Sequence, residues 1–188
     1  MIKNLKPAIV LTLLLLVLIG FGYPLVLWGI GQLMPHNSSG APIVQEERII
    51  GYENIGQSFM NDNYFWGRPS AVIYNAAATG GSNKGPSNPD YLAEVQARID
   101  TFMVYNPGIK KEDIPSDLVT ASGGGLDPHI SPQGAYIQIL RVAKSRNIEA
   151  EKIKNLVTHN IEKPILGLLG PERVNVLKLN LALDNLNK

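Results

Sequence analysis

The longest uncharged stretch of this chain lies near its N-terminus and constrains the fold more than any other feature. No charged residue occurs between residues 7 and 35, and residues 8–28 include eight leucines and six isoleucine, valine or phenylalanine residues. A helix of that length rises about 30 Å, the thickness of the hydrocarbon core of a bilayer. Each large apolar residue favours insertion by roughly 0.3 to 0.6 kcal/mol. We therefore predict one transmembrane helix over residues 8–34, with the lipid bilayer as its surroundings.

Two other structures would also fit the apolar stretch. A cleaved signal peptide would use Lys3 and Lys6 as its basic region and the small residues 39–41 as its cleavage site. The stretch is longer than the roughly 7 to 15 apolar residues of a typical signal peptide, however, and Pro42 would follow the cleaved bond. A buried helix of a soluble protein is also apolar all round, but so long an uncharged run favours a membrane span.

The charges on either side of the span predict its direction. Lys3, Lys6 and the terminal amine precede it, whereas no cation follows it before Arg48. Because cytoplasmic flanks carry the excess of lysine and arginine, residues 1–7 are expected in the cytoplasm and the later part of the chain outside it. The predicted location is the cell (inner) membrane, crossed once.

Three residues interrupt the second half of the span. Gly20 and Gly22 would let a neighbouring helix approach closely, and Pro24 removes one backbone donor. We interpret Gly20, Gly22 and Pro24 as positions that pack against other membrane helices, and we expect Pro24 to kink the last turns.

The rest of the chain has the length and composition of one folded domain. We predict a polar linker at residues 35–41 and a soluble extracytoplasmic domain at residues 42–188. The sequence has no cysteine, which excludes disulfides, thiolate metal sites and a cysteine nucleophile. The net charge is +1, and without Lys3 and Lys6 the 17 basic residues become 15 against 16 acidic ones. A nucleic acid is therefore a poor candidate partner.

Periodicity and capping residues predict an α+β fold, with a single mixed α/β domain after the span. A helix is expected from Pro89, capped by Asn88, to the Asn-Pro-Gly sequence at residues 106–108. The other expected elements are helices over residues 131–146 and 150–161, extended segments at residues 43–50 and 55–59, and a brief strand followed by a helix within residues 174–186.

Two glycine-rich segments, residues 79–89 and 120–132, each precede a predicted helix. Free N–H groups at a helix N-terminus suit anion binding, but neither segment has the Gly-Lys-Ser/Thr ending of a phosphate-binding P-loop. We interpret both as ordered structural loops or partner contacts rather than as a small-anion or nucleotide site. Their candidate contact residues are Ser82, Asn83, Asp127 and His129.

Ser122, Asp127 and His129 raise the alternative of a membrane-anchored hydrolase. The strained Gly-x-Ser-x-Gly turn of many hydrolases is absent, however, and Pro128 favours Asp127 as an acceptor of hydrogen bonds within its own loop. The three histidines of the chain show no ligand spacing. We therefore expect neither catalytic residues nor a metal site. A binding module that acts alone is the other alternative.

Residues 64–71 bring three aromatic side chains close to Arg68. Such a segment forms either a partner-binding patch or a loop folded onto the core. Arg68 is a candidate contact residue, because its planar donors suit carboxylates and loop carbonyls.

Short motifs extend along most of the chain, at residues 56–59, 64–65, 67–71, 80–83, 117–122, 126–132, 141–143 and 173–177. Together with the N-terminal helix they resemble the C subunit of the Kdp-type potassium-transporting ATPases of bacteria and archaea. The sequence departs from the family's pattern in three ways: Gly124 replaces a usual serine, Pro171 and Glu172 invert a Glu-Pro pair, and Ile161 replaces a threonine.

The resemblance implies a non-catalytic accessory subunit of a high-affinity, ATP-driven potassium uptake complex. Its partners would be the potassium-translocating subunit and the P-type ATPase subunit. This chain lacks both the Asp-Lys-Thr-Gly phosphorylation sequence and a selectivity-filter loop. The family is described as a catalytic chaperone that raises the ATP affinity of the ATPase subunit, so no cofactor is expected to bind firmly and ATP would meet this chain only in a ternary complex. Because ATP is cytoplasmic, we expect a domain outside the cell to cap the translocation subunit and stabilise the assembly.

Overall fold

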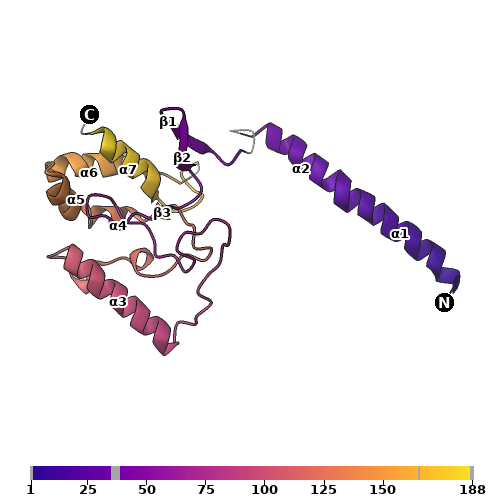
Figure 1. The fold of residues 1–188 in the computed structure, drawn as a ribbon, viewed down its shortest axis with the longest axis horizontal. Coiled ribbons are helices and arrows are strands. Elements are labelled where there is room, and N and C mark those ends of the chain that lie inside the picture. Colours follow the sequence, from indigo (N-terminus) through magenta and orange to yellow (C-terminus); the bar gives the residue numbers. More distant parts are fainter. Residues whose placement is uncertain (1, 35–38, 165, 187–188) are drawn as a thin grey trace. The chain divides into compact units, whose positions relative to one another are not determined.

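The computed structural model describes residues 2–34, 39–164 and 166–186. The chain divides into two compact units, Met1–Pro42 and Ile43–Lys188. Most of the predicted linker, residues 35–38, lies outside the described residues. Figure 1 shows a long helix followed by a mixed α/β domain. The predicted fold class, an N-terminal apolar helix followed by such a domain, is confirmed.

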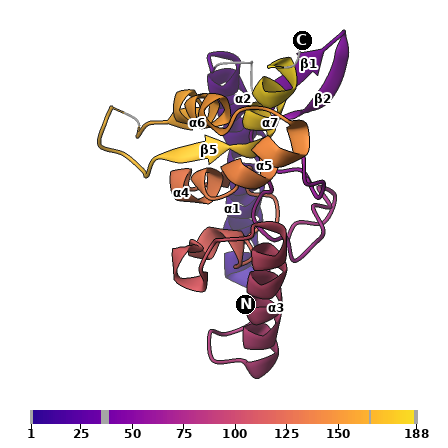
Figure 2. The ribbon, with the colours of Figure 1, turned by 90° about the vertical axis from the view of Figure 1, so that its left-hand side faces the viewer.

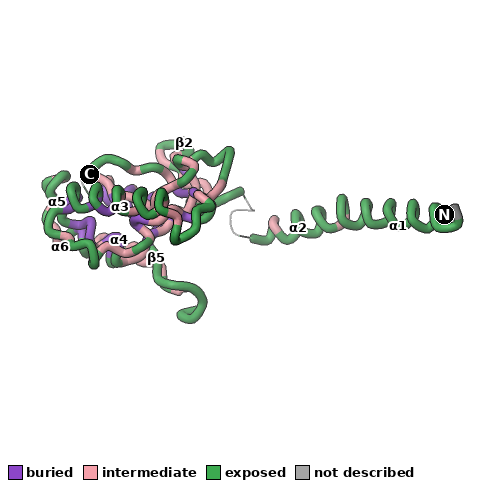
Figure 3. Tube along the Cα trace, turned by 90° about the horizontal axis from the view of Figure 1, so that it is seen from below, coloured by how far each residue is buried: buried purple, intermediate pink, exposed green. Residues whose placement is uncertain are grey.

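The first unit is one continuous helix in three parts. A 3-10 turn at Ile2–Asn4 leads into α1 (Leu5–Val17), a π-helical turn (Leu18–Gly22) and α2 (Tyr23–Gln32). Leu5–Gln32 is long and apolar enough to cross a membrane, and no other helix among the described residues is. Almost all of its described residues are exposed and coloured green in Figure 3.

Pro24 explains the π-helical turn. Proline has no N–H, so Pro24 cannot bond the carbonyl of Gly20, its usual partner four residues earlier. The N–H of Tyr23 instead bonds the carbonyl of Leu18, five residues earlier. The disturbance expected at Pro24 thus takes the form of one widened turn, the common local form of a π-bulge.

Three of the helices in the second unit begin where the sequence predicts. The side chain of Asn88 accepts hydrogen bonds from two N–H groups of α3 (Pro89–Tyr105), and Gly108 follows that helix with a φ of 93°. Helix α6 (Ala150–His159) stops short of the predicted end, because Ile161 pairs with Val174 in a sheet. A brief strand is followed by α7 (Val176–Asn185), as expected, with Asn175 as its cap.

The helix expected over residues 131–146 is broken into α4 (Pro132–Tyr136) and α5 (Ile139–Arg146). The break follows from the side chain of Gln138. Its amide donates to the carbonyl of Gly134 at 2.9 Å, which is the carbonyl that the backbone N–H of Gln138 would take in a continuous helix. That N–H bonds Ala135 instead, three residues earlier. The prediction of one uninterrupted helix was therefore wrong.

Short strands form two small sheets. Strands β1 (Pro42–Gln45) and β2 (Arg48–Tyr52) pair as a hairpin within the expected extended region. The second sheet has the antiparallel order β3-β5-β4, built from His129–Ile130, Arg173–Asn175 and Ile161–Glu162, and Figure 2 shows its central strand β5. The central strand β5 pairs with β3, which lies about 45 residues earlier in the sequence, and His129 faces Asn175 in this pairing.

Residues 55–59 form no strand, contrary to the sequence prediction. The segment is held by single hydrogen bonds instead, from Gly56 N–H to the Leu126 carbonyl at 2.8 Å and from the Gln57 side chain to the Ile50 carbonyl at 3.1 Å. A Cβ on Gly56 would lie 2.5 Å from the carbonyl oxygen of Asp127, so only glycine permits this approach. The segment therefore serves as a contact to the loop before β3.

The core of the domain lies between α4, α5, α6, α7 and the second sheet, and Figure 3 shows its buried positions in purple. Its buried apolar residues are Phe65, Phe102, Leu118, Ile130, Ala135, Ile137, Ile139, Val142, Ala143, Ile153, Val157, Val174, Val176, Leu179 and Leu183.

Candidate functional site

Two buried amides hold the aromatic segment onto the core. The side chain of Asn180, in α7, accepts from the N–H of Phe65 at 2.9 Å and donates to its carbonyl at 3.0 Å. Gln138 forms the same pair of bonds with Trp66, at 2.8 and 3.2 Å. Each amide thus takes the place of a neighbouring strand's backbone. The segment is thereby fixed at two consecutive residues, and the Phe65 side chain is 0% exposed.

Arg141 fixes the same segment from the side of α5. Its guanidinium donates to the carbonyls of Asp62 and Tyr64 at 2.7 and 3.0 Å, and it lies 4.2 Å from the centre of the Trp66 ring. Burial lowers the pKa of Arg141 to about 10, although the nearby Asp62 carboxylate opposes this shift. The group therefore remains charged near neutral pH and serves as a structural cation.

Arg146 closes the segment at its other end. It donates to the Asn63 carbonyl and to the Asp184 carboxylate, both at 2.6 Å, and it lies over the Tyr64 ring at 4.7 Å. The Tyr64 hydroxyl donates to the other oxygen of Asp184 at 3.1 Å. The aromatic residues are therefore mostly structural, which leaves Arg68 as the polar group at the edge of the segment.

Arg68 forms an ion pair with Asp127 across two distant loops, at 2.9 Å. Burial alone raises the pKa of Asp127, but hydrogen bonds from His129 and the Arg68 guanidinium outweigh it and lower that pKa to about 2. The backbone N–H of His129 donates to Asp127 at 3.0 Å. The structure thus brings together three of the predicted contact residues, Arg68, Asp127 and His129, and uses Asp127 as an acceptor inside its loop.

Tyr74 buttresses this ion pair from behind. Its hydroxyl donates to the backbone carbonyl of Arg68, and its pKa rises to about 12 because of burial and the nearby Asp127, partly opposed by Arg68. A Cβ on Gly67 would lie 2.9 Å from the Tyr74 hydroxyl oxygen. A glycine before Arg68 is thus what lets the tyrosine reach the backbone.

The two glycine-rich loops pack against each other. Gly80 N–H bonds the Gly124 carbonyl at 3.2 Å, and a Cβ on Gly81 would lie 2.8 Å from the Gly123 carbonyl oxygen. The next two residues were predicted as contact residues: Ser82 is half-buried, and Asn83 is exposed with a φ of 54°. Close backbone packing accounts for these glycines without a bound anion.

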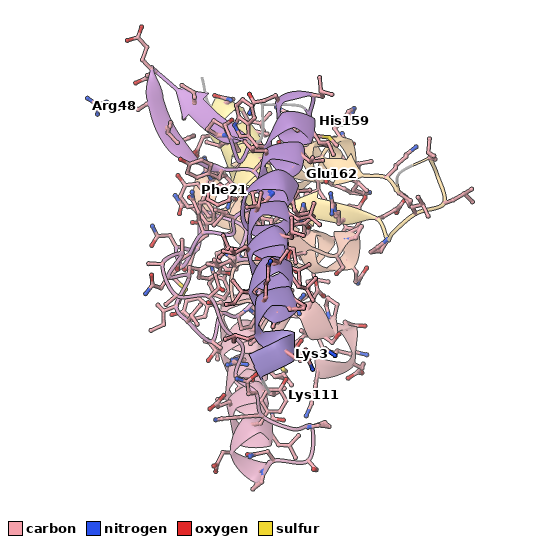
Figure 4. All side chains as sticks on the ribbon, turned by 90° about the vertical axis from the view of Figure 1, so that its right-hand side faces the viewer. Lys3, Phe21, Arg48, Lys111, His159 and Glu162 are labelled. Carbon is pink, nitrogen blue, oxygen red and sulfur yellow. The ribbon has the colours of Figure 1, made fainter. Side chains whose placement is uncertain are left out.

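His129 also belongs to a charged network around the second sheet. Its Nε2 lies 3.7 Å from Glu162, which lies in the edge strand β4 (Figure 4). Glu162 contacts Arg173 at 3.0 Å and Lys178 at 3.3 Å, and Lys178 also bonds Glu53. Burial raises the pKa of Glu162, but hydrogen bonds and charges from these cations outweigh it and lower the pKa. The network ties three strands and α7 together.

The hydrolase alternative has no geometric support in the described part of the chain. Ser122 is 4% exposed, and its backbone N–H bonds the Pro69 carbonyl at 3.1 Å. The charged groups beside His129 are Asp127 and Glu162, and no hydrogen bond joins its ring to Ser122. The described residues also contain no cluster of three histidine, aspartate or glutamate side chains placed to hold a metal ion.

A pocket of about 420 Å³ opens beside Arg68, between residues 58–74 and one face of α3. Met60 and Ile73 at this pocket are 79% and 87% exposed. Arg98 also lines it and donates to the Val119 carbonyl at 3.1 Å. Its other main lining residues are Phe59, Trp66, Tyr74, Ala97, Thr101, Phe102 and Leu118. An apolar hollow with two arginines suits a partner's side chains.

Several of these structural residues were missed by the sequence analysis: Gln138, Arg141, Arg146, Glu162, Lys178 and Asn180. One signal was present for three of them. Gln138, Arg141 and Asn180 each stand between two large apolar residues in the sequence, where a polar side chain has to find partners in the core. Their partners lie about 70 to 115 residues away, so periodicity could not identify them.

Comparison with known proteins identifies the family. The family model described as "KdpC: K+-transporting ATPase, c chain" matches residues 5–185. The potassium-transporting ATPase KdpC subunits of Flavobacterium psychrophilum and Flavobacterium johnsoniae are 55% and 54% identical over 184 residues, which cover 98% of this chain and 99% of each relative. That of Polaromonas naphthalenivorans is 50% identical over 189 residues, or 98% and 96% of the two chains. The chain therefore belongs to the KdpC family, the c chains of the K+-transporting ATPases.

Proposed function

We propose that this chain is a non-catalytic subunit that stabilises the assembly of the potassium-translocating subunit and the P-type ATPase subunit. One observation carries the proposal: among the described residues a single helix, Leu5–Gln32, is long and apolar enough to cross a membrane, and its surface is exposed along its length. One helix encloses no path for an ion and buries no surface of its own. It can serve transport only by packing against other subunits, for which Gly20, Gly22 and Pro24 are suited.

Co-purification tests this assignment. A tagged chain should bring down two larger membrane subunits in about equal amounts, and deletion of the chain should dissociate them and abolish growth at micromolar potassium. The strain has to lack other high-affinity potassium uptake. Full assembly and potassium-stimulated ATP hydrolysis without this chain would overturn the proposal.

We place the partner contact of the domain at the pocket beside Arg68. Met60 and Ile73 leave large apolar surface exposed there, although Arg68 itself is already paired with Asp127. Met60→Glu or Ile73→Glu should leave the fold intact and reduce co-purification at least fivefold. Ile49→Glu, at an exposed apolar residue on the hairpin, is the matched control. Equal recovery of all three variants would contradict this placement.

The charge asymmetry around the helix supports an extracytoplasmic domain that caps the outer face of the translocation subunit. Lys3 and Lys6 precede the helix, and the next cation is Arg48. Because the chain has no cysteine, single cysteines report its orientation cleanly. An impermeant thiol reagent added outside intact cells should label Met60→Cys and spare Lys3→Cys. The reverse pattern would overturn this orientation.

The same proposal includes the role of a catalytic chaperone that raises the ATP affinity of the ATPase subunit. With the domain outside, that effect has to pass through the membrane helices rather than through direct contact with ATP. Adding this chain to the other two subunits should lower the apparent KM for ATP. Crosslinking of an azido-ATP analogue should then label the ATPase subunit and not this chain. Labelling of residues 43–188 would contradict the relayed mechanism.

A further inference from the structure

The loop between β4 and β5 carries exposed leucines. Leu166, Leu168 and Leu169 are 87%, 86% and 62% exposed. In Figures 2 and 4 this loop projects from the sheet, away from the helices of the domain. Large apolar side chains that protrude together from a soluble domain usually mark a contact with another molecule or with lipid.

The loop is uniformly apolar between two fixed ends. The sequence from residue 164 to residue 171 is Pro-Ile-Leu-Gly-Leu-Leu-Gly-Pro, with no polar side chain. Gly167 and Gly170 have positive φ values of 73° and 92°, and Gly167 N–H bonds the Pro164 carbonyl at 2.9 Å. At its base Glu162 pairs with Arg173 both in the strand register and by a contact of 3.0 Å. The sheet therefore presents the leucines on a narrow, anchored projection.

We propose that Leu166, Leu168 and Leu169 insert into the interfacial layer of the lipid bilayer, as a second membrane contact beside the transmembrane helix. A protein interface typically includes a hydrogen bond for every 100 to 200 Å² or so, yet the side chains of this loop offer no donor or acceptor. Lipid requires only apolar surface. The exposed cations Lys163 and Arg173 at the base of the loop suit the headgroup region.

A short linker joins the domain to the membrane helix. Ten residues separate Gln32, the last helical residue, from Ile43, the first residue of the domain. Ten extended residues reach at most about 36 Å. The linker therefore holds the domain close to the membrane that its own helix crosses. Contact between the leucines and lipid is then an intramolecular step, favoured by a high effective concentration.

The backbone sets the depth of insertion. Loop N–H and C=O groups without partners are not tolerated in the hydrocarbon core. Insertion should therefore stop in the interface, within about 5 to 10 Å of the headgroup boundary.

A single fluorescent label tests the contact in the full-length chain, reconstituted alone in nanodiscs. Leu168→Cys is labelled with an environment-sensitive fluorophore, and Ile73→Cys, with a wild-type side chain that is equally exposed, is the matched control. With brominated phosphatidylcholine, we expect emission from position 168 to fall at least twofold and to shift to shorter wavelength. Position 73 should show neither change.

Equal, weak quenching at both positions would overturn the proposal. Quenching that is absent from the chain alone, with protection appearing only after the other subunits are added, would also overturn it and assign the loop to a protein interface. Circular dichroism of each labelled variant confirms the fold. The result does not depend on the orientation of the chain or on assembly of the transporter, because the chain is measured by itself and either face of a nanodisc offers lipid.

Discussion

Asn180 lies in α7 and Gln138 in the break between α4 and α5, and their side chains supply hydrogen bonds that a neighbouring β-strand would otherwise make. Each forms two hydrogen bonds with the backbone of one residue in the aromatic segment. Buried amides in such positions are stabilising only as long as every bond is made, because an unpaired backbone group left in the core is costly.

Replacement of Asn180 measures this clamp. Asn180→Ala should lower the free energy of unfolding by about 2 to 4 kcal/mol, because it leaves the N–H and C=O of Phe65 buried without partners. Denaturant titration followed by circular dichroism measures the change. Asn155→Ala, at an exposed helical asparagine, should stay within about 0.5 kcal/mol of the wild type. Similar losses in both variants would refute the clamp.

Asp127 should make stability depend on pH in the acid range. Its pKa is about 2 in the folded domain against an ordinary 3.8, so folding favours the carboxylate. Stability from a lowered pKa is fully present above the unfolded value and is lost as pH falls through the folded value. The Tm advantage of the wild type over Asp127→Asn should therefore be constant above about pH 5 and shrink between about pH 4 and pH 2.

Above about pH 5, the free energy of unfolding of the wild type should exceed that of Asp127→Asn by about 1 kcal/mol. The difference is small because the side chain of Asp127 is a third exposed and solvent screens the ion pair. Asp113→Asn, at an exposed carboxylate, serves as the control. A constant gap between wild type and Asp127→Asn down to pH 2 would show that the ion pair does not control acid stability.

At the scale of elements, the two glycine-rich loops form one packed unit. Gly81→Ala should destabilise the domain by about 1 to 3 kcal/mol, because its Cβ would lie 2.8 Å from the Gly123 carbonyl oxygen and the backbone would have to move. Gly85→Ala is the control in the same segment, since its Cβ would meet nothing within 4 Å. Thermal denaturation compares them. Equal Tm values would mean that the loops do not pack closely in solution.

Pro24 should determine which side of α2 faces the partner helices. Pro24→Ala restores an N–H, lets the Gly20 carbonyl bond normally and removes the π-helical turn. The chain keeps its length, but the change from π-helical to α-helical winding at Leu18–Gly22 rotates α2 about the helix axis relative to α1, by up to about the 100° that one α-helical residue spans. Co-purification of the partner subunits should fall severalfold.

Pro7→Ala is the control for this change, because Pro7 lies in the first turn of α1, where an N–H has no partner within the helix. Equal recovery of partners by the two variants would show that the π-helical turn has no part in assembly.

For the whole molecule, the two units should fold independently. Every core residue that the structure describes lies within the second unit, so a chain of residues 43–188 should remain folded with a Tm within a few degrees of the full-length protein. Calorimetry measures this. The shortened chain should also fail to recover the transporter subunits, because the membrane helix is missing. Loss of the folded state on truncation would contradict the division into two units.

The apolar helix, the cap at Asn88 and the fold class were predicted from sequence because each depends on neighbours within a few residues. The single helix predicted at residues 131–146 is broken, because the Gln138 side chain takes the Gly134 carbonyl that the helix would use. The extended segment predicted at residues 55–59 forms no strand, because Gly56 bonds the Leu126 carbonyl instead. Arg68, Asp127 and His129 were named from sequence as candidate contact residues. Their contact with one another in the folded domain was not predicted.

The sequence by itself determined that one helix is apolar enough to cross a membrane, that a mixed α/β domain follows it, and which family the motifs resemble. These properties depend on local composition and spacing, which the chain carries before it folds. Only the tertiary structure decided that Asn180, Gln138 and Arg141 hold the aromatic segment, and that leucines 166, 168 and 169 project into solvent. Hydrogen bonds across some 70 to 115 residues and the exposure of a loop arise when distant segments pack, and no periodic pattern encodes them.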